Sequence, residues 1–295
     1  MRDQCISPAV GYTALSSGSV SLHDGKSSMT GGGSLNTRQS HHARVAQHGL
    51  KGDSSNMSLL HLARRMANVT GIDVSRLRDS HLGYRRVQLL NHHRVTHVWD
   101  VGANDGGYAR ESRRFGYRGR IVSFEPLHDL YQLLKKQAGH DPLWTALPYA
   151  LGAERSEATI NVAGNSGASS SFLPMLDRHR IAAPSATYVG SQTVQVHRLD
   201  EVWKEFASPE DQMFLKVDVQ GFEGQVLAGA DRILGMCVGL QLELSFVPLY
   251  EGAMSYLDGF KLAASRGFTV MSLEPGFTDR RTGQMLQADA VFFKT

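Results

Sequence analysis

The stretch VTHVWDVGANDGGY, residues 95–108, determines how the rest of the chain is interpreted. Its first seven residues form a short run rich in β-branched side chains, which is typical of a strand buried within a sheet. The strand pattern stops at Gly102, and residues 106–115 then show a helical pattern. Glycines between a strand and a helix let the backbone turn tightly and approach a ligand closely. We therefore expect a ligand site at this turn.

Strand and helix patterns alternate after this turn. The sequence predicts strands at residues 119–124, 147–151, 213–219 and 238–246, and helices at residues 129–137, 223–234 and 256–265. Two further strands, at residues 268–273 and 288–293, are joined by a polar stretch and resemble an antiparallel hairpin. This order predicts a doubly wound α/β sheet, and the final hairpin argues against an all-parallel dinucleotide domain.

The N-terminal part differs in composition from the rest of the chain. Residues 1–57 contain 11 Ser and 8 Gly without sustained apolar periodicity, so we expect a flexible tail there. One hypothesis is that this tail is not native and that the protein begins at Met29 or Met57. Residues 58–94 are expected to form an N-terminal helical segment, and residues 95–295 the main domain.

Charge and composition exclude several classes of protein. The whole chain has 31 Lys+Arg and 28 Asp+Glu, but residues 1–57 account for 5 and 3 of these, which leaves 26 and 25. The remaining domain is nearly neutral, so we expect no nucleic-acid partner. No apolar run is long enough to span a membrane, and no apolar signal region follows Arg2, which favours a cytoplasmic protein.

The sequence has no pattern typical of a metal site or of a disulfide framework. It has 2 cysteines, too few for a disulfide scaffold or a four-thiolate site, and Cys237 is expected to be a small buried residue. No His, Asp or Glu grouping has a clear metal-ligand spacing, so we predict no obligatory metal.

The residues around the turn favour an adenosine ligand without phosphates. The dinucleotide fingerprint G-x-G-x-x-G is broken at Asn104, and Asp100 at the strand end favours a cationic or hydrogen-bonding ligand. Glu125 follows the next strand, 23 residues after Gly102 (125 − 102), where a carboxylate can accept both ribose hydroxyls. Pro126 ends that strand. Together these features predict S-adenosylmethionine, which has an adenosine and a sulfonium.

Several motifs then resemble one family, the FkbM-type S-adenosylmethionine-dependent methyltransferases, over residues 95–295. The matching motifs are DVGAN (100–104) with Gly106 and Tyr108, FEP (124–126), ALG (150–152), SSS (169–171), LD (199–200), and KVDVQGFE (216–223) with Val226, Leu227 and Gly229. This sequence departs from the family pattern at Gln220, where the family usually has Glu.

The resemblance implies a seven-stranded, Rossmann-like class I methyltransferase fold and O-methylation of a hydroxyl on a sugar, glycan or secondary metabolite. It implies that Asp100, Gly102 and Asn104 surround the methionine part of the cofactor. It also implies that Glu125 binds ribose, that the backbone near Ala150 lines the adenine, and that Asp218 lies near the sulfonium. Gly106 and Pro126, which belong to the same motifs, complete the expected cofactor-binding residues.

An alcohol acceptor must lose its proton, and a general base for this step contributes about 10²–10⁴-fold. Asp218 is the first candidate, and Lys216, two residues earlier, projects from the same strand face and could orient it. Alternatively, Asp218 only binds the cofactor and Lys216 only balances its charge. Glu243 either faces the site, or is exposed at an edge or held in a salt bridge.

One histidine lies within the longest irregular segment, residues 164–192, and another follows it; we expect this segment to form part of the acceptor wall. His179 and His197 could act as bases, although a solvent-exposed loop histidine is the commoner arrangement.

Two other functions are open at this stage. The first is an NAD-dependent oxidoreductase on a related sheet, which the broken fingerprint argues against. The second is a non-catalytic methyltransferase-like binding protein, which only Gln220 favours. For the methyltransferase, the expected partner is a small-molecule or glycan acceptor.

Overall fold

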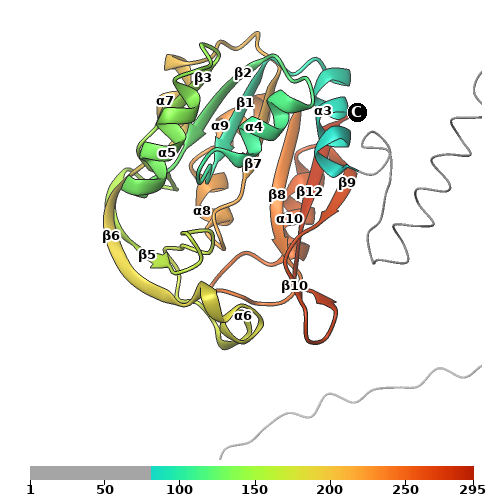
Figure 1. Cartoon of the computed structure of the whole chain (residues 1–295). Helices are drawn as coiled ribbons and strands as arrows, with labels where there is room; N and C mark the ends of the chain where they lie inside the picture. Colours follow the sequence, from blue (N-terminus) through green and yellow to red (C-terminus); the bar gives the residue numbers. More distant parts are fainter. Residues whose placement is uncertain (1–80) are drawn as a thin grey trace, which may run out of the picture. The chain divides into compact units, whose positions relative to one another are not determined.

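The computed structural model of this protein describes residues 81–295 (Figure 1). The predicted tail at residues 1–57 and the helical pattern up to residue 80 lie outside the described residues. The first described element is helix α3 (Leu82–His92), which matches the end of the predicted N-terminal helical segment. Within the described range, no helix has both the length and the apolar character that a membrane span requires.

A seven-stranded sheet forms the centre of this part of the chain. In spatial order its strands are β3 (Trp144–Leu147), β2 (Arg120–Phe124), β1 (His97–Val101), β7 (Met213–Val217), β8 (Gly239–Ser245), β12 (Gln287–Lys294) and β9 (Phe268–Pro275). Strand β12 runs antiparallel to both of its neighbours, and the other pairs are parallel. The predicted doubly wound, mostly parallel sheet with an antiparallel C-terminal pair is confirmed.

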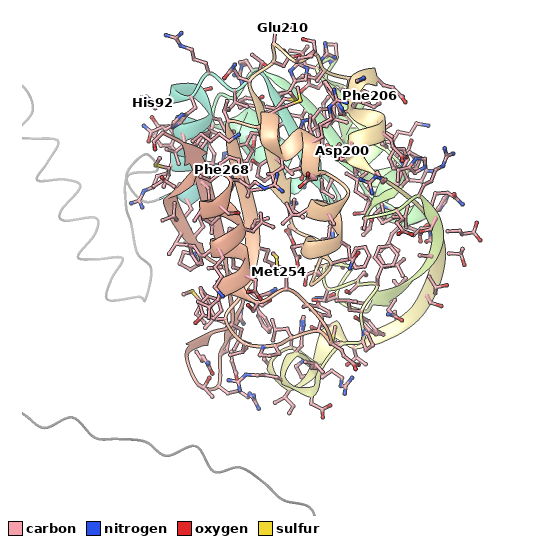
Figure 2. The ribbon with its side chains drawn as sticks, turned by 180° about the vertical axis from the view of Figure 1, so that it is seen from behind. His92, Asp200, Phe206, Glu210, Met254 and Phe268 are labelled. Atoms are coloured by element: carbon pink, nitrogen blue, oxygen red, sulfur yellow. The ribbon has the colours of Figure 1, made fainter. Side chains whose placement is uncertain are left out.

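Helices cover both faces of this sheet. On one face, in front in Figure 1, lie α3, α4 (Gly107–Arg114) and α5 (His128–Ala138). On the opposite face, seen from behind in Figure 2, lie α7 (Leu199–Val202), α8 (Glu223–Ala228), α9 (Asp231–Met236) and α10 (Tyr256–Ser265). Two apolar clusters fill the two layers, and every residue of β1 and β7 is buried between them. Burial on both faces explains why apolar residues occupy consecutive positions of these strands, such as Val98 and Trp99 in β1 or residues 213–215 in β7.

The predicted strand at residues 147–151 is wrong in its bounds, because the chain there divides between two sheets. Residues Trp144–Leu147 form the edge strand β3, whereas β4 (Ala150–Leu151) pairs with β6 in a separate three-stranded sheet. That sheet also contains β5 (Ser156–Ala163) and β6 (Tyr188–His197), and β6 takes in the last residues of the segment expected to be irregular. Few residues of β5 and β6 are buried, so only a weak apolar pattern marked these strands in the sequence.

The helix predicted at residues 223–234 is two helices, α8 and α9. The break lies at Gly229, where an added Cβ would approach the carbonyl oxygen of Gly152 to 1.8 Å. The Asp200 carboxylate, labelled in Figure 2, accepts hydrogen bonds from the backbone N–H groups of Arg232 and Ile233 and so caps the new helix. A contact with a distant loop therefore ends one helix, and a distant carboxylate begins the next.

The remaining elements are short and lie in the connections. They are α6 (Asp177–Ala182), the 3₁₀ helices Pro184–Ala186 and Trp203–Glu205, and the β10 (Thr278–Asp279) and β11 (Gln284–Met285) pair between β9 and β12.

Candidate functional site

The turn after β1 brings the ends of two central strands together. Gly102 has a φ of +76°, and an added Cβ there would lie 1.8 Å from the carbonyl oxygen of Asp218. The N–H of Asp218 in turn donates a hydrogen bond of 3.2 Å to the Val101 carbonyl oxygen. Only glycine permits this backbone conformation without strain and leaves room for the neighbouring strand end. Further along, Gly106 (φ +87°) precedes α4, and its Cα faces the ring of Trp144.

A cavity of about 420 Å³ opens at the carboxyl ends of β1, β2 and β7. Residues of the irregular segment, including Asn165 and Ser170, close it from the opposite side. Of the residues predicted to bind the cofactor, six line this cavity: Gly102, Asn104, Glu125, Pro126, Ala150 and Asp218. Asp100 and Gly106 do not line it. Residues from four separate motifs thus meet around one volume.

Glu125, which follows β2, connects the end of this strand to the glycine turn by hydrogen bonds. Its two carboxylate oxygens accept hydrogen bonds of 2.9 Å each from the backbone N–H groups of Leu127 and Asn104. Burial raises the pKa of Glu125 to about 7, although these two N–H groups favour the ionised form and oppose the rise. Since each carboxylate oxygen can accept a second hydrogen bond, the side chain can still accept hydrogen bonds from a ligand.

Asp100 lies beneath the turn instead of on the cavity wall. Its side chain is fully buried, with one oxygen accepting a hydrogen bond of 2.8 Å from the Ser123 hydroxyl. The other oxygen lies 3.1 Å from the Lys216 ammonium nitrogen. Asp100 therefore supports the turn through Lys216 and has no direct access to the cavity.

Lys216 contacts three groups at the ends of β1 and β7. Its Nζ donates hydrogen bonds to the carbonyl oxygens of Val101 (3.2 Å) and Gly102 (2.8 Å), and lies 3.6 Å from a carboxylate oxygen of Asp218. Burial would lower the pKa of Lys216, but the carboxylates of Asp100 and Asp218 outweigh it and raise that pKa above its ordinary value. The ammonium group thus stays charged beside the turn and Asp218.

Asp218 is the exposed carboxylate of this group. About 35% of its side chain is exposed, against 5% for Lys216. One of its oxygens accepts a hydrogen bond of 3.1 Å from the Gln220 amide, and the other faces Lys216. A carboxylate held on two sides and open on the third is suited to accept a proton from a bound alcohol.

The structure also decides the position of Glu243, which the sequence left open. Glu243 lies near the end of β8, and its Oε2 accepts hydrogen bonds from the side-chain amides of Gln220 (2.8 Å) and Gln287 (2.7 Å). Burial and the charge of Asp218 raise the pKa of Glu243 well above its ordinary value. Glu243 therefore joins the site through the Gln220 amide, although it does not line the cavity itself.

A second cavity, of about 340 Å³, lies on the other side of the glycine turn. It shares Gly102, Asn104, Asp105 and Asp218 with the first, but its remaining wall is charged. Arg86 of α3 enters this wall, held by ion pairs with Glu111 and Glu274. The sequence reasoning missed Arg86, because its partners lie 25 and 188 residues away and no local pattern connects them.

The expectation of a solvent-exposed loop histidine is wrong for His179. Its side chain is buried beside Tyr250 and Phe277, and burial lowers its pKa to about 4. Its Nε2 lies 3.3 Å from the Ser169 hydroxyl. His197 contacts the Tyr149 ring at the end of β6, and neither histidine lines the first cavity. Cys237 is buried, as expected. Within residues 81–295, no group of His, Cys, Asp and Glu is arranged to hold a metal ion.

The strand order, with its one antiparallel strand, and the ligand cavity at the first turn define a class I methyltransferase. Residues 100–270, more than half of the chain, match the model of the methyltransferase FkbM domain. The chain therefore belongs to the FkbM methyltransferase family. S-adenosyl-L-methionine is its cofactor, as the sequence predicts.

Solved structures of other methyltransferases resemble this chain at low sequence identity. A methyltransferase FkbM from Methylobacillus flagellatus is 15% identical with a TM-score of 0.42, and the match covers 68% of this chain and 43% of that one. An O-methyltransferase from Bacillus cereus is 13% identical with a TM-score of 0.40, over 83% and 93% of the two chains. Magnesium protoporphyrin IX methyltransferase from Synechocystis is 12% identical with a TM-score of 0.38, over 80% and 96%. No curated protein matches the chain.

Proposed function

We propose that this protein transfers the methyl group of S-adenosylmethionine to a hydroxyl group on a sugar, a glycan or a secondary metabolite. The observation that carries this proposal is the charge of the first cavity. Among the described residues that line it are the carboxylates of Asp105, Glu125 and Asp218, and none is Lys or Arg. Such a wall suits a ligand with a positive sulfonium and no phosphate, and it disfavours the pyrophosphate of a nicotinamide dinucleotide.

The cavity residues fit the cofactor in shape as well as in charge. Gly102, which has no side chain, lines the cavity with backbone atoms, and the buried Glu125 carboxylate offers acceptors for ribose hydroxyls. Apolar side chains such as Phe124 and Leu151 line the part expected to hold the adenine, next to Ala150. Asp100 and Gly106 do not line the cavity. Asp100 affects it through its ion pair with Lys216, and Gly106 affects it by allowing the turn that begins α4.

The bound cofactor supplies an activated methyl group, so the chain itself must position the acceptor oxygen and take up its proton. Asp218 is the proposed general base, because it is exposed to the cavity and anchored by the Lys216 ammonium group and the Gln220 amide. Lys216 is the proposed orienting residue, and its charge keeps the carboxylate facing the same direction throughout the reaction.

The charge of the domain bears on the class of acceptor. A near-neutral domain disfavours a nucleic-acid acceptor, and a small molecule or glycan that presents a hydroxyl is the proposed partner. We infer that the protein acts in the cytoplasm.

Calorimetric titration of the purified full chain with S-adenosylhomocysteine and with NADH tests the cofactor. We expect binding of the first and none of the second, and the reverse result would favour an oxidoreductase. Transfer of a radiolabelled methyl group to a panel of sugars and hydroxylated metabolites then tests the reaction. If the cofactor binds but no acceptor is methylated, a non-catalytic binding protein becomes the better interpretation.

A further inference from the structure

The side chain of Gln220 connects the two carboxylates at the ends of β7 and β8. Its Nε2 donates one hydrogen bond of 3.1 Å to Asp218 and a second of 2.8 Å to Glu243. Its Oε1 accepts a hydrogen bond of 2.8 Å from the Tyr250 hydroxyl. The orientation of the amide follows from its partners, because Nε2 lies between two carboxyl groups, which accept hydrogen bonds when ionised, and the Tyr250 hydroxyl donates to Oε1.

The backbone of Gln220 is held as firmly as its side chain. Its φ is +55°, in the left-handed region that residues other than glycine rarely adopt. The Ser171 hydroxyl donates a hydrogen bond of 2.7 Å to the Gln220 carbonyl oxygen, and the Tyr250 hydroxyl also lies 3.2 Å from the Ser169 carbonyl oxygen. Such a conformation persists only where the surroundings impose it, and it directs the amide toward the two carboxylates.

A neutral amide at this position has a clear electrostatic advantage over a carboxylate. Two carboxyl groups this close repel each other when both are ionised, and one N–H directed at each offsets that repulsion. A Glu side chain at position 220 has the same length, but it would remove both donors and bring a third carboxyl group to the same place.

We propose that Gln220 is a positioning residue for methyl transfer, whose side-chain amide holds Asp218 and Glu243 in a fixed arrangement toward the acceptor oxygen. This inference rests on the proposed function, since it concerns the same acceptor site. The amide contacts the two carboxylates and acts on the reaction only through them. Other titratable groups face the pair from the neighbouring elements: Lys216 of β7, Glu223 of α8, Tyr250, and Asp289 of β12.

Two substitutions of similar size test this role. Gln220→Met removes both donors without adding charge, and Gln220→Glu replaces them with a carboxyl group. For both variants we expect kcat to fall about tenfold to a hundredfold, with the affinity for S-adenosylhomocysteine within about twofold of the wild type. The acidic limb of the kcat–pH profile should move to higher pH by about one unit, because the ionised carboxylates lose a stabilising N–H, and it should move further in Gln220→Glu.

The control is Gln195→Met, which removes another amide that donates to a carboxylate. Gln195 lies on β6, and its Nε2 donates a hydrogen bond of 2.9 Å to Glu157 at an exposed position. We expect its kcat and pH profile to match those of the wild type. Thermal unfolding of each variant establishes that it is folded. A second variant, Tyr250→Phe, releases the other end of the amide and should move the acidic limb in the same direction by a smaller amount.

A direct titration keeps this inference separate from the choice of acceptor. In protein labelled with ¹³C at its carboxyl groups, NMR should show a higher apparent pKa for Glu243 in Gln220→Met than in the wild type. An unchanged Glu243 titration, or an unchanged kcat–pH profile in a Gln220→Met variant that still methylates a hydroxyl, would overturn the positioning role. A wild-type protein that methylates no hydroxyl acceptor contradicts the proposed function instead, and the NMR titration still decides the role of Gln220.

Discussion

The two cavities on either side of the glycine turn differ sharply in their walls, although they share the turn and Asp218. The first is lined by apolar side chains and carboxylates, with no Lys or Arg among its described residues. The second is lined by Arg86, Lys216, Glu111 and Asp289, so both signs of charge meet there. One wall therefore suits an uncharged nucleoside next to a cation, and the other suits a group that carries both charges. Asp218 lies where the two cavities meet.

The largest expected effect comes from Asp218, one of the residues that line both cavities. Asp218→Asn keeps the size of the side chain but removes its negative charge and most of its basicity. We expect turnover to fall by about 10²–10⁴-fold, because the acceptor loses its base. Steady-state methyl transfer measures this fall, and S-adenosylhomocysteine binding is expected to change much less. Turnover close to that of the wild type would exclude Asp218 as base or essential positioning group.

The next effect concerns the turn that separates the cavities. Gly102→Ala places a Cβ against the Asp218 carbonyl oxygen at a positive φ, and we expect it to lower the free energy of unfolding by about 3 kcal/mol. Gly116→Ala is the matched control, since it also has a positive φ (+99°) but nothing within 4 Å of the added Cβ. Its cost should be about 1 kcal/mol, from backbone strain alone. Urea unfolding of both variants measures the difference, and equal losses would refute the close approach.

A smaller effect is expected in the first cavity alone. Glu125→Gln keeps a hydrogen-bonding side chain of the same size but replaces one acceptor oxygen with a donor. We expect the affinity for S-adenosylhomocysteine to fall about tenfold, because the ribose hydroxyls lose one acceptor and the Asn104 or Leu127 N–H loses its partner. Calorimetry measures this change. Unchanged affinity would mean that the ribose assignment is wrong.

The smallest effect is the pH dependence of stability that Glu125 contributes. Burial raises its pKa to about 7 in the folded protein, above its ordinary value of 4.5, so the folded state binds more protons than the unfolded state between these values. The contribution of this group to stability is therefore fully present below about pH 4.5 and is lost as the pH rises toward 7. Relative to Glu125→Gln, the wild type should lose about 1–2 kcal/mol across this range in urea unfolding. Parallel curves for the two proteins would contradict the raised pKa.

The main sheet was predictable from the sequence because its strands are buried on both faces. The apolar run that ends at Val101 and its partner at residues 213–217 each became a fully buried strand. The smaller sheet escaped prediction for the opposite reason. In β6 only Val194 and Val196 are buried, which is too short an apolar alternation to mark a ten-residue strand, and backbone pairing with β5 supplies the rest.

The candidate site also contains residues that the sequence predicted and residues that it did not. Gly102, Asn104, Glu125 and Asp218 lie in local motifs, and the structure gathers them around one cavity. No local sequence motif indicated that Arg86 belongs to the site, because its position depends on packing between elements that are distant in the chain.

The sequence by itself determined most strand positions of the central sheet, the glycine turn and the family, because each depends on residues that are close in the chain. Only the tertiary structure decided that Asp100 supports the turn from below, that His179 is buried, and that one amide joins Asp218 to Glu243. The physical reason is that burial and hydrogen-bond partners are properties of the folded environment. The same carboxyl or imidazole group changes its pKa and its role with the side chains that surround it.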